Sequence, residues 1–99
     1  MFARVSQVQY PPQHDDAGLR VVVEELLPAL RRVPGCRGCC LLADGKPGNG
    51  LGIVFWETEH AADAASTSAD VAAARVKLAA LGLTFASRQI YDVVTCDRW

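Results

Sequence analysis

The sequence predicts an α+β fold of the ferredoxin-like type, with a four-stranded antiparallel sheet and helices on one face. Segments rich in β-branched and aromatic residues alternate with segments whose apolar residues recur at helical spacing, in the order β-α-β-β-α-β. A run of turn residues at 44–50, DGKPGNG, joins the two central strands as a hairpin. This order is the split βαβ arrangement, which carries its helices on one side of an antiparallel sheet.

The first strand is expected over residues 2–10, where FARVSQVQY precedes two prolines. The first helix is expected from Asp15, whose charge suits a first turn, to the basic residues that begin at Arg31. Pro28 lies inside the helical pattern and predicts a bend there. The apolar stripe of this helix comprises Leu19, Val22, Val23, Leu26, Leu27 and Leu30.

The second half of the chain supplies a hairpin, two short helices and a last strand. The hairpin strands are expected over residues 36–43 and 51–57. Thr58 is positioned to cap a short helix that begins at Glu59, and Ser68 to cap a second helix that Gly82 ends. The apolar face of that second helix comprises Val71, Ala74, Leu78 and Leu81. The last strand is expected over residues 85–95.

Length and composition indicate one globular domain over residues 1–99. The apolar fraction is 51%, the charged fraction 21% and the net charge −1, so no basic footprint indicates nucleic acid or anionic lipid. No apolar run reaches the roughly 18 residues of a membrane span, and no signal peptide is recognisable. A cytoplasmic location is expected, where thiols stay reduced.

The predicted strands carry apolar residues on both faces. Val5 and Val8 point to opposite faces, and so do Ile53 and Val54. Because the helices cover only one face, the other face requires a different cover. We therefore predict a homodimer.

Four segments resemble the antibiotic biosynthesis monooxygenase family: FARVSQVQYPP at the start, LPALRRVPGC, GLGIVFWETEHAADA and the closing RQIYDVV. The resemblance spans nearly the whole chain, and its most specific part is the strand end at Trp56 followed by Glu57, Thr58 and Glu59. It implies a dimeric α+β barrel, in which two four-stranded sheets close face to face. Some members of the family oxygenate polycyclic phenols without metal or flavin, because the substrate carbanion itself reduces O₂. Others degrade haem, act on small quinones, or have no known activity.

The resemblance implies a pocket between sheet and helices for a small apolar or aromatic ligand. Arg4, Ser6 and Tyr91 are the candidates to bind its enolate or phenolate, and Trp56 is either a fold anchor or a ligand contact. Arg88, unusual in a strand, is the other candidate cation or a partner in an ion pair. Two functions remain open: a cofactor-independent monooxygenase, and a non-catalytic ligand-binding or accessory dimer.

Haem degradation does not fit the residues. The positions that hold pocket residues in the haem-degrading branch are here Ser6, Ala65 and approximately Arg75. The histidines, His14 and His60, fall at helix starts, so a haem ligand is missing. We expect no cofactor and no metal.

Three of the four cysteines lie within GCRGCC, at 36, 39 and 40. Regular alternation along a strand places Cys36 and Cys39 on opposite faces, and Cys36 and Cys40 on one face roughly 13 Å apart. Neither pair then fits a disulfide or a zinc site. Cys96 is expected in the last strand, at the opposite edge of the sheet. We interpret all four as small packing residues.

Overall fold

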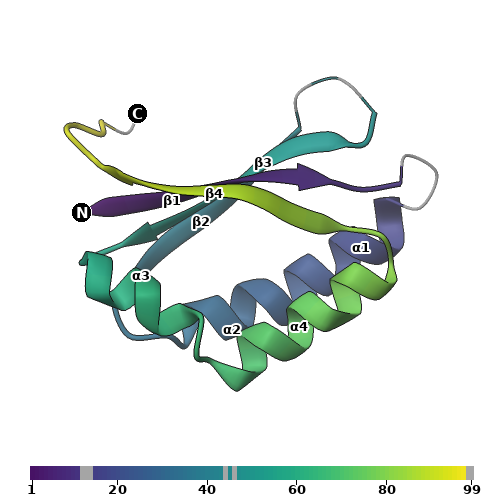
Figure 1. The fold of residues 1–99 in the computed structure, drawn as a ribbon, viewed down its shortest axis with the longest axis horizontal. Helices are drawn as coiled ribbons and strands as arrows, with labels where there is room; N and C mark the ends of the chain where they lie inside the picture. The colour runs from purple at the N-terminus through teal and green to yellow at the C-terminus, as the bar shows by residue number, and fades with distance from the viewer. Residues whose placement is uncertain (12–14, 44, 46, 98–99) are drawn as a thin grey trace.

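The computed structural model describes residues 1–11, 15–43, 45 and 47–97 (Figure 1). The predicted turn residues Asp44 and Lys46, and also His14, lie outside the described residues. The elements in chain order are β1 (Phe2–Gln9), α1 (Asp15–Val21), η1 (Val22–Leu26), α2 (Leu27–Arg31), β2 (Cys36–Ala43), β3 (Asn49–Trp56), α3 (Glu59–Ala65), α4 (Ala69–Ala80) and β4 (Thr84–Asp92).

The four strands form one antiparallel sheet in the order β2-β3-β1-β4. All the helices lie against one face, with α1, α2 and α4 running beneath the sheet (Figure 1). The predicted ferredoxin-like topology is confirmed, with β2 and β4 at opposite edges. None of the helices in the described ranges is long and apolar enough to cross a membrane.

The first helical segment is continuous but irregular. Between α1 and α2, the segment η1 is a π-helix, and the Leu27 N–H donates to the Val22 carbonyl, five residues back. Pro28 lies in the first turn of α2, has no N–H to donate, and its ring crowds the preceding turn. The irregularity predicted at Pro28 therefore takes the form of a widened turn directly before it.

Helices α3 and α4 begin at the predicted caps, and α4 ends at the predicted glycine. The Thr58 hydroxyl accepts from the Ala61 N–H at 3.0 Å, and the Ser68 hydroxyl accepts from the Val71 N–H at 3.3 Å. At the end of α4, Gly82 has a φ of +85°, and the Leu83 N–H donates to the Leu78 carbonyl at 2.9 Å. This glycine C-cap turns the chain back toward β4.

Two strand boundaries differ from prediction by more than one residue. β3 begins at Asn49, two residues early, because Asn49 and Gly50 still pair with β1. β4 ends at Asp92, which pairs with Phe2 at the start of β1. Beyond that point β1 offers no residue to pair with, so Cys96 lies outside the strand, contrary to prediction.

The core fills the layer between the sheet and the helices. Its largest fully buried side chains are Val8, Trp56, Val71 and Leu78. Cross-strand partners point to the same side of an antiparallel sheet, so the register assigns each residue to a face. Val8 and Val54 face the helices, whereas Val5 and Ile53 lie on the other side, which we call the open face. The predicted two-sided apolar strands are confirmed.

Candidate functional site

The helix-facing side of β1 runs past two hollows. Every second residue of this stretch points toward the helices, namely Arg4, Ser6, Val8 and, just past the strand end, Tyr10. The first two line a small hollow whose walls combine polar side chains with the apolar Leu26, Leu30, Val54 and Phe85, and the last two line a larger apolar cavity.

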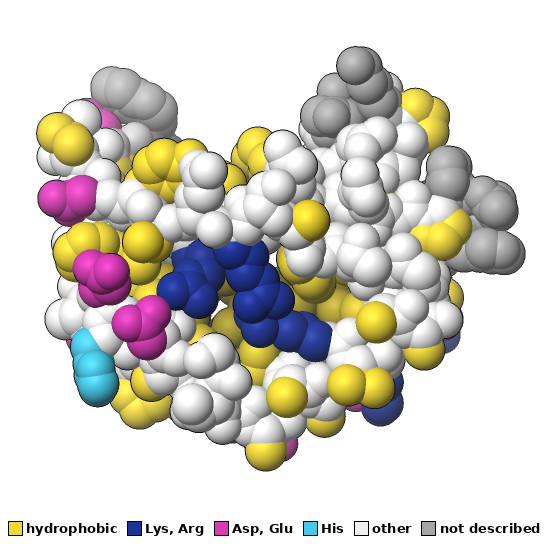
Figure 2. All heavy atoms as spheres, viewed as in Figure 1, with side chains coloured by type: hydrophobic (Ala, Val, Ile, Leu, Met, Phe, Trp, Pro, Cys, Tyr) yellow, Lys and Arg dark blue, Asp and Glu magenta, His cyan; other side chains and the backbone are white. Residues whose placement is uncertain are grey.

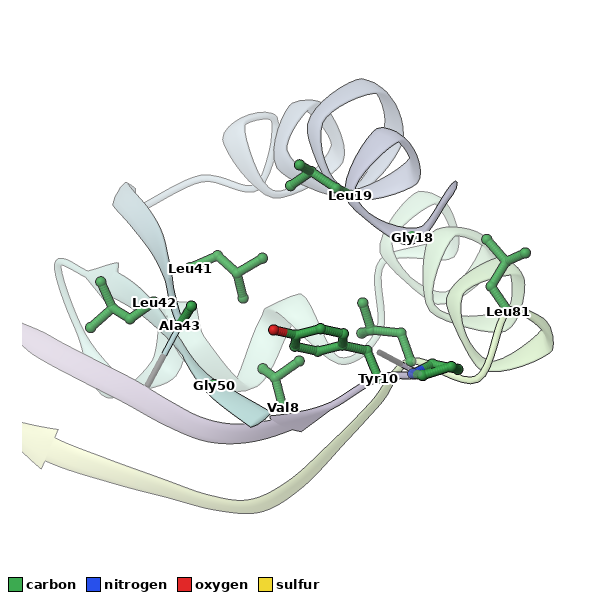
Figure 3. Close-up of a pocket in the computed structure, with 11 residues that line it drawn as sticks. Val8, Tyr10, Gly18, Leu19, Leu41, Leu42, Ala43, Gly50 and Leu81 are labelled. Atoms are coloured by element: carbon green, nitrogen blue, oxygen red, sulfur yellow. The ribbon is translucent and has the colours of Figure 1, made fainter. Parts of the chain in front are cut away.

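The larger cavity has a volume of about 280 Å³, is partly open to solvent, and lies between α1, the ends of β1, β2 and α4, and the start of β3 (Figure 3). The Tyr10 ring lies across it, with its hydroxyl directed toward Leu41 and Ala43 (Figure 3). The backbone of Tyr10 is fixed by a 2.9 Å hydrogen bond from its N–H to the Gly48 carbonyl. The other lining residues, all apolar or glycine, are Val8, Pro11, Gly18, Leu19, Leu42, Gly50, Leu81 and Leu83.

The smaller hollow, of about 40 Å³, is lined by three arginines from three elements: Arg4 of β1, Arg75 of α4 and Arg88 of β4. We call it the arginine hollow. Figure 2 shows basic side chains gathered in a depression between the sheet and the helices. Ser6, which is only 8% exposed, also lines the hollow and brings a hydroxyl to it.

Phe85 and Val8 separate the two hollows. They are partners across β1 and β4, and both lie over Gly52 of β3, 3.5 Å from where a Cβ would stand. Val8 lines the apolar cavity, whereas Phe85 and Gly52 line the arginine hollow. The aromatic ring is thus the partition between an apolar and a cationic space.

A bulge in β4 directs Arg88 into the arginine hollow. Phe85 pairs with Val8 and Ile90 pairs with Arg4, so Phe85 and Ile90 both face the helices. These two residues are five positions apart in the sequence. Regular alternation would put them on opposite faces, and the extra residue lies at the register shift, where Ser87 has a φ of +53°. Beyond the bulge, Arg88 shares the face of Ile90.

The charges in the arginine hollow are only partly balanced. The Arg4 guanidinium pairs with Asp63 at 3.2 Å. Burial lowers the pKa of Arg75, and the nearby charges of Arg88 and Arg4 lower it further. A guanidinium still remains protonated at neutral pH, so the hollow is positively charged.

The comparisons with known proteins agree with this fold. The family model for antibiotic biosynthesis monooxygenases matches residues 1–77. The chain belongs to the antibiotic biosynthesis monooxygenase family.

Solved structures of this family share the whole architecture. A proposed antibiotic biosynthesis monooxygenase from Deinococcus radiodurans has 18% identity and a TM-score of 0.80, covering 100% of this chain and 98% of its own. SnoaB, a cofactor-independent oxygenase from Streptomyces nogalater, has 17% identity and a TM-score of 0.72, covering 96% and 94%. Because the identity is this low, these structural similarities establish only the fold.

Sequence relatives are uncharacterised proteins of Mycobacterium tuberculosis. They are 33% identical over 61 residues, which is 62% of this chain and 26% of theirs. The match therefore spans about a quarter of the length of these relatives.

In this member of the family the four predicted site residues do not come together. Arg4 and Ser6 share the arginine hollow, but Trp56 is 1% exposed in the core and lines neither hollow. Among the described residues its indole N–H has no hydrogen-bond partner. Tyr91 lies on the open face, 51% exposed, and its hydroxyl donates to Gln89. The predicted Arg4–Ser6–Tyr91 set is therefore divided between two faces of the sheet.

The cysteine faces were predicted wrongly. Cys36 pairs with Trp56 and Cys39 with Val54, and both of these partners face the helices. A register shift between Cys36 and Gly38 adds one residue, so Cys36 and Cys39 share a face and Cys40 takes the open face. All four thiols are free. Within the described ranges, no cluster of three His, Cys, Asp or Glu side chains could hold a metal ion.

Two residues with polar side chains that line the hollows were not predicted as site residues. Tyr10 continues the alternation of Arg4, Ser6 and Val8, and this period-two pattern could have identified it. Arg75 lies between Val71 and Leu78 on the buried face of α4, where a charged residue is itself a signal.

Proposed function

We propose that this protein is a cofactor-independent monooxygenase of small aromatic phenols or quinols, with the ring bound in the apolar cavity. The observation that carries the proposal is the cavity itself, whose walls are apolar except for one inward hydroxyl, Tyr10. Pockets for drug-sized ligands span about 300–1,000 Å³, so a volume of 280 Å³ suits a ligand of one or two rings. The structural similarity to SnoaB, a cofactor-independent oxygenase, supports oxygenation as the class of reaction.

The chemistry in this proposal belongs to the substrate. A phenol carbon loses its hydrogen and becomes a quinone carbonyl, one oxygen atom of O₂ enters that carbonyl, and the other leaves as water. The phenolate supplies all the electrons. The protein binds the ring, excludes water through the apolar walls, and donates a hydrogen bond from Tyr10 to the developing oxyanion.

We propose further that the working unit is a cytoplasmic homodimer. The open face of the sheet presents apolar side chains from every strand, and none of the helices formed by the described residues covers it (Figure 1). Leu51 and Tyr91 on this face are 37% and 51% exposed. The shape and the apolar composition of the open face suit packing against the same face of a second copy of the chain.

Oxygen uptake tests the proposed activity. Wild-type protein treated with a chelator is mixed with a panel of one- and two-ring phenols and quinols, and O₂ consumption is measured against heat-denatured protein. Tyr10→Phe is expected to lower kcat at least 10-fold with little change in ligand affinity, because the hydroxyl acts on the charge that develops in the transition state.

Tyr91→Phe is the matched variant, since it removes the same hydroxyl from the open face. It is expected to keep wild-type turnover. If Tyr91→Phe abolishes turnover and Tyr10→Phe does not, the reaction occurs on the open face and the apolar cavity is not the active site.

A ligand-binding protein without catalysis is the second candidate. The observation that favours it is the single polar side chain, Tyr10, among the described residues that line the cavity. Saturable binding of panel members with no O₂ consumption by any of them would establish this function instead.

A further inference from the structure

Three arginines that are far apart in the sequence line one small space. Arg4, Arg75 and Arg88 come from the first strand, the last helix and the last strand, and all three border the arginine hollow. Arginines that serve only as solvated surface charges spread apart, because their repulsion is smaller at larger separation. Their convergence on a hollow therefore requires an explanation.

Carboxylates of the protein do not fully neutralise the hollow. Arg4 is 23% exposed and pairs with Asp63, which is itself 67% exposed. In the part of the chain that the structure describes, neither Arg75 nor Arg88 forms an ion pair. By contrast, Arg32, Arg37 and Lys77 on the outer surface each pair with an acidic residue.

The backbone is also arranged to bring in the third arginine. Ser87 is the one residue other than glycine, among those described, with a positive φ. This conformation is unfavourable for a side-chain-bearing residue, and it forms the bulge that turns Arg88 toward the helices. In a strand without the bulge that kept the pairing of Phe85 with Val8, regular alternation would put Arg88 on the open face, away from Arg4 and Arg75. Strained residues of this kind cluster at binding sites.

We propose that the arginine hollow binds one small oxyanion, a carboxylate or phosphate group. Guanidinium groups bind such groups through paired N–H donors in a planar fork, and the Ser6 hydroxyl adds a further donor. This site goes beyond the proposed oxygenase function and does not depend on it. The anion is either a free ion or an acidic substituent of a ligand whose rings occupy the apolar cavity on the other side of Phe85.

A titration with inorganic phosphate, measured by isothermal titration calorimetry, tests the site. One phosphate per chain is expected to bind to the wild-type protein, with an affinity that falls as sodium chloride is added. Arg75→Gln and Arg88→Gln are each expected to weaken binding at least 10-fold. Arg20→Gln is the matched control, because it removes one exposed positive charge from α1, outside the hollow, and should leave binding unchanged.

Two substitutions at Ser87 test whether the bulge places Arg88. Ser87→Gly accepts a positive φ without strain and is expected to bind phosphate as the wild type does. Ser87→Val disfavours that φ and is expected to lose as much affinity as Arg88→Gln. Circular dichroism melting confirms that each variant is folded. Wild-type affinity in Ser87→Val would contradict the role of the bulge.

Competition identifies the source of the anion. If 4-(4-hydroxyphenyl)butanoate, whose flexible chain can carry its carboxylate past Phe85, displaces phosphate and 4-butylphenol does not, the site holds the acidic group of a ring ligand; if neither displaces it, the site holds a free ion. Absence of saturable phosphate binding, or wild-type affinity in both Arg75→Gln and Arg88→Gln, would overturn the proposal. The titration needs no turnover, so a failure to consume O₂ would count against the oxygenase function alone.

Discussion

Cys39 illustrates how one residue's surroundings determine its reactivity. Its side chain faces α2 and is partly buried, and burial raises the pKa of its thiol, as does the neighbouring Cys36. The charge of Arg31 acts in the opposite direction but is the weaker influence. Since the thiolate is the nucleophile, a raised pKa lowers the reactive fraction at neutral pH.

We therefore predict that Cys39 is alkylated slowly. With iodoacetamide at pH 7.5, Cys96, which is exposed, should react at least 10-fold faster than Cys39, measured by peptide mass spectrometry over time. Raising the pH should increase the alkylation rate of Cys39 up to and beyond pH 9. The ordinary pKa of a thiol is 9.0, and the pKa of Cys39 lies above that value. Equal rates for Cys39 and Cys96 at pH 7.5 would contradict this account.

Individual pocket residues were only partly predictable from the sequence. Ser6 was found through the resemblance to the family, which has pocket residues in the middle of the first strand, and Arg4 because a charged residue is unusual in a strand. Arg88 was noticed as a charge in a strand, but its face could not be known, because Ser87 carries no compositional sign of a bulge. A glycine there would have been a signal; a serine is not.

At the scale of the elements, the ends of the helices could be predicted from local sequence, whereas the faces on which strand residues lie could not. The caps at Thr58 and Ser68 and the glycine stop at Gly82 were all predictable, because each satisfies backbone groups within a few residues. The faces of β2 and β4 reversed part-way along, because each strand contains one inserted residue. A one-residue insertion exchanges inward and outward side chains for the rest of the strand.

The junction between α2, β2 and α3 depends on Gly35. Its φ is +88°, and its carbonyl accepts from the Glu57 N–H at 2.8 Å, tying the start of β2 to the end of β3. A Cβ at this position would stand 2.6 Å from the Cβ of Ala61 on α3. Both the conformation and the space therefore require glycine.

Gly35→Ala is predicted to lower the free energy of unfolding by about 2–4 kcal/mol, since it adds a steric overlap to the cost of a positive φ. Gly45→Ala is the matched control: its φ is +85°, but among the described residues no side chain or backbone atom lies within 4 Å of the added Cβ. It should cost only about 1 kcal/mol. Urea unfolding measures both variants, and equal losses would mean that the contact with Ala61 has no effect.

At the scale of the whole molecule, the sheet is covered on one face only. The helices bury the side that carries Val8 and Trp56, whereas the open face of β1 and β3 presents Val5, Leu51 and Ile53. The sequence predicted this imbalance, because its strands are apolar in both alternating positions. It could not predict the division of the interior into an apolar and a cationic space, which depends on long-range packing of Phe85 over Gly52.

The homodimer proposed above gives a prediction for the whole molecule. Leu51→Glu places a charge on the open face, where it would be buried without a partner in a sheet-to-sheet dimer. Val76→Glu is the matched control, because Val76 is 70% exposed on α4 in the helical layer. Sedimentation equilibrium should give a dimer for the wild type and Val76→Glu, and a monomer for Leu51→Glu.

The two variants carry the same added charge, so a difference in mass can arise only from where that charge lies. A face buried between two sheets excludes water, and a lone carboxylate there costs several kcal/mol, enough to separate a dimer of ordinary affinity at micromolar concentration. On the solvated helical layer the same carboxylate costs almost nothing. A wild-type protein that stays monomeric at all concentrations would contradict the proposed dimeric barrel, since the open face would then be exposed to solvent. A dimer that dissociates with Val76→Glu instead would place the interface on the helices.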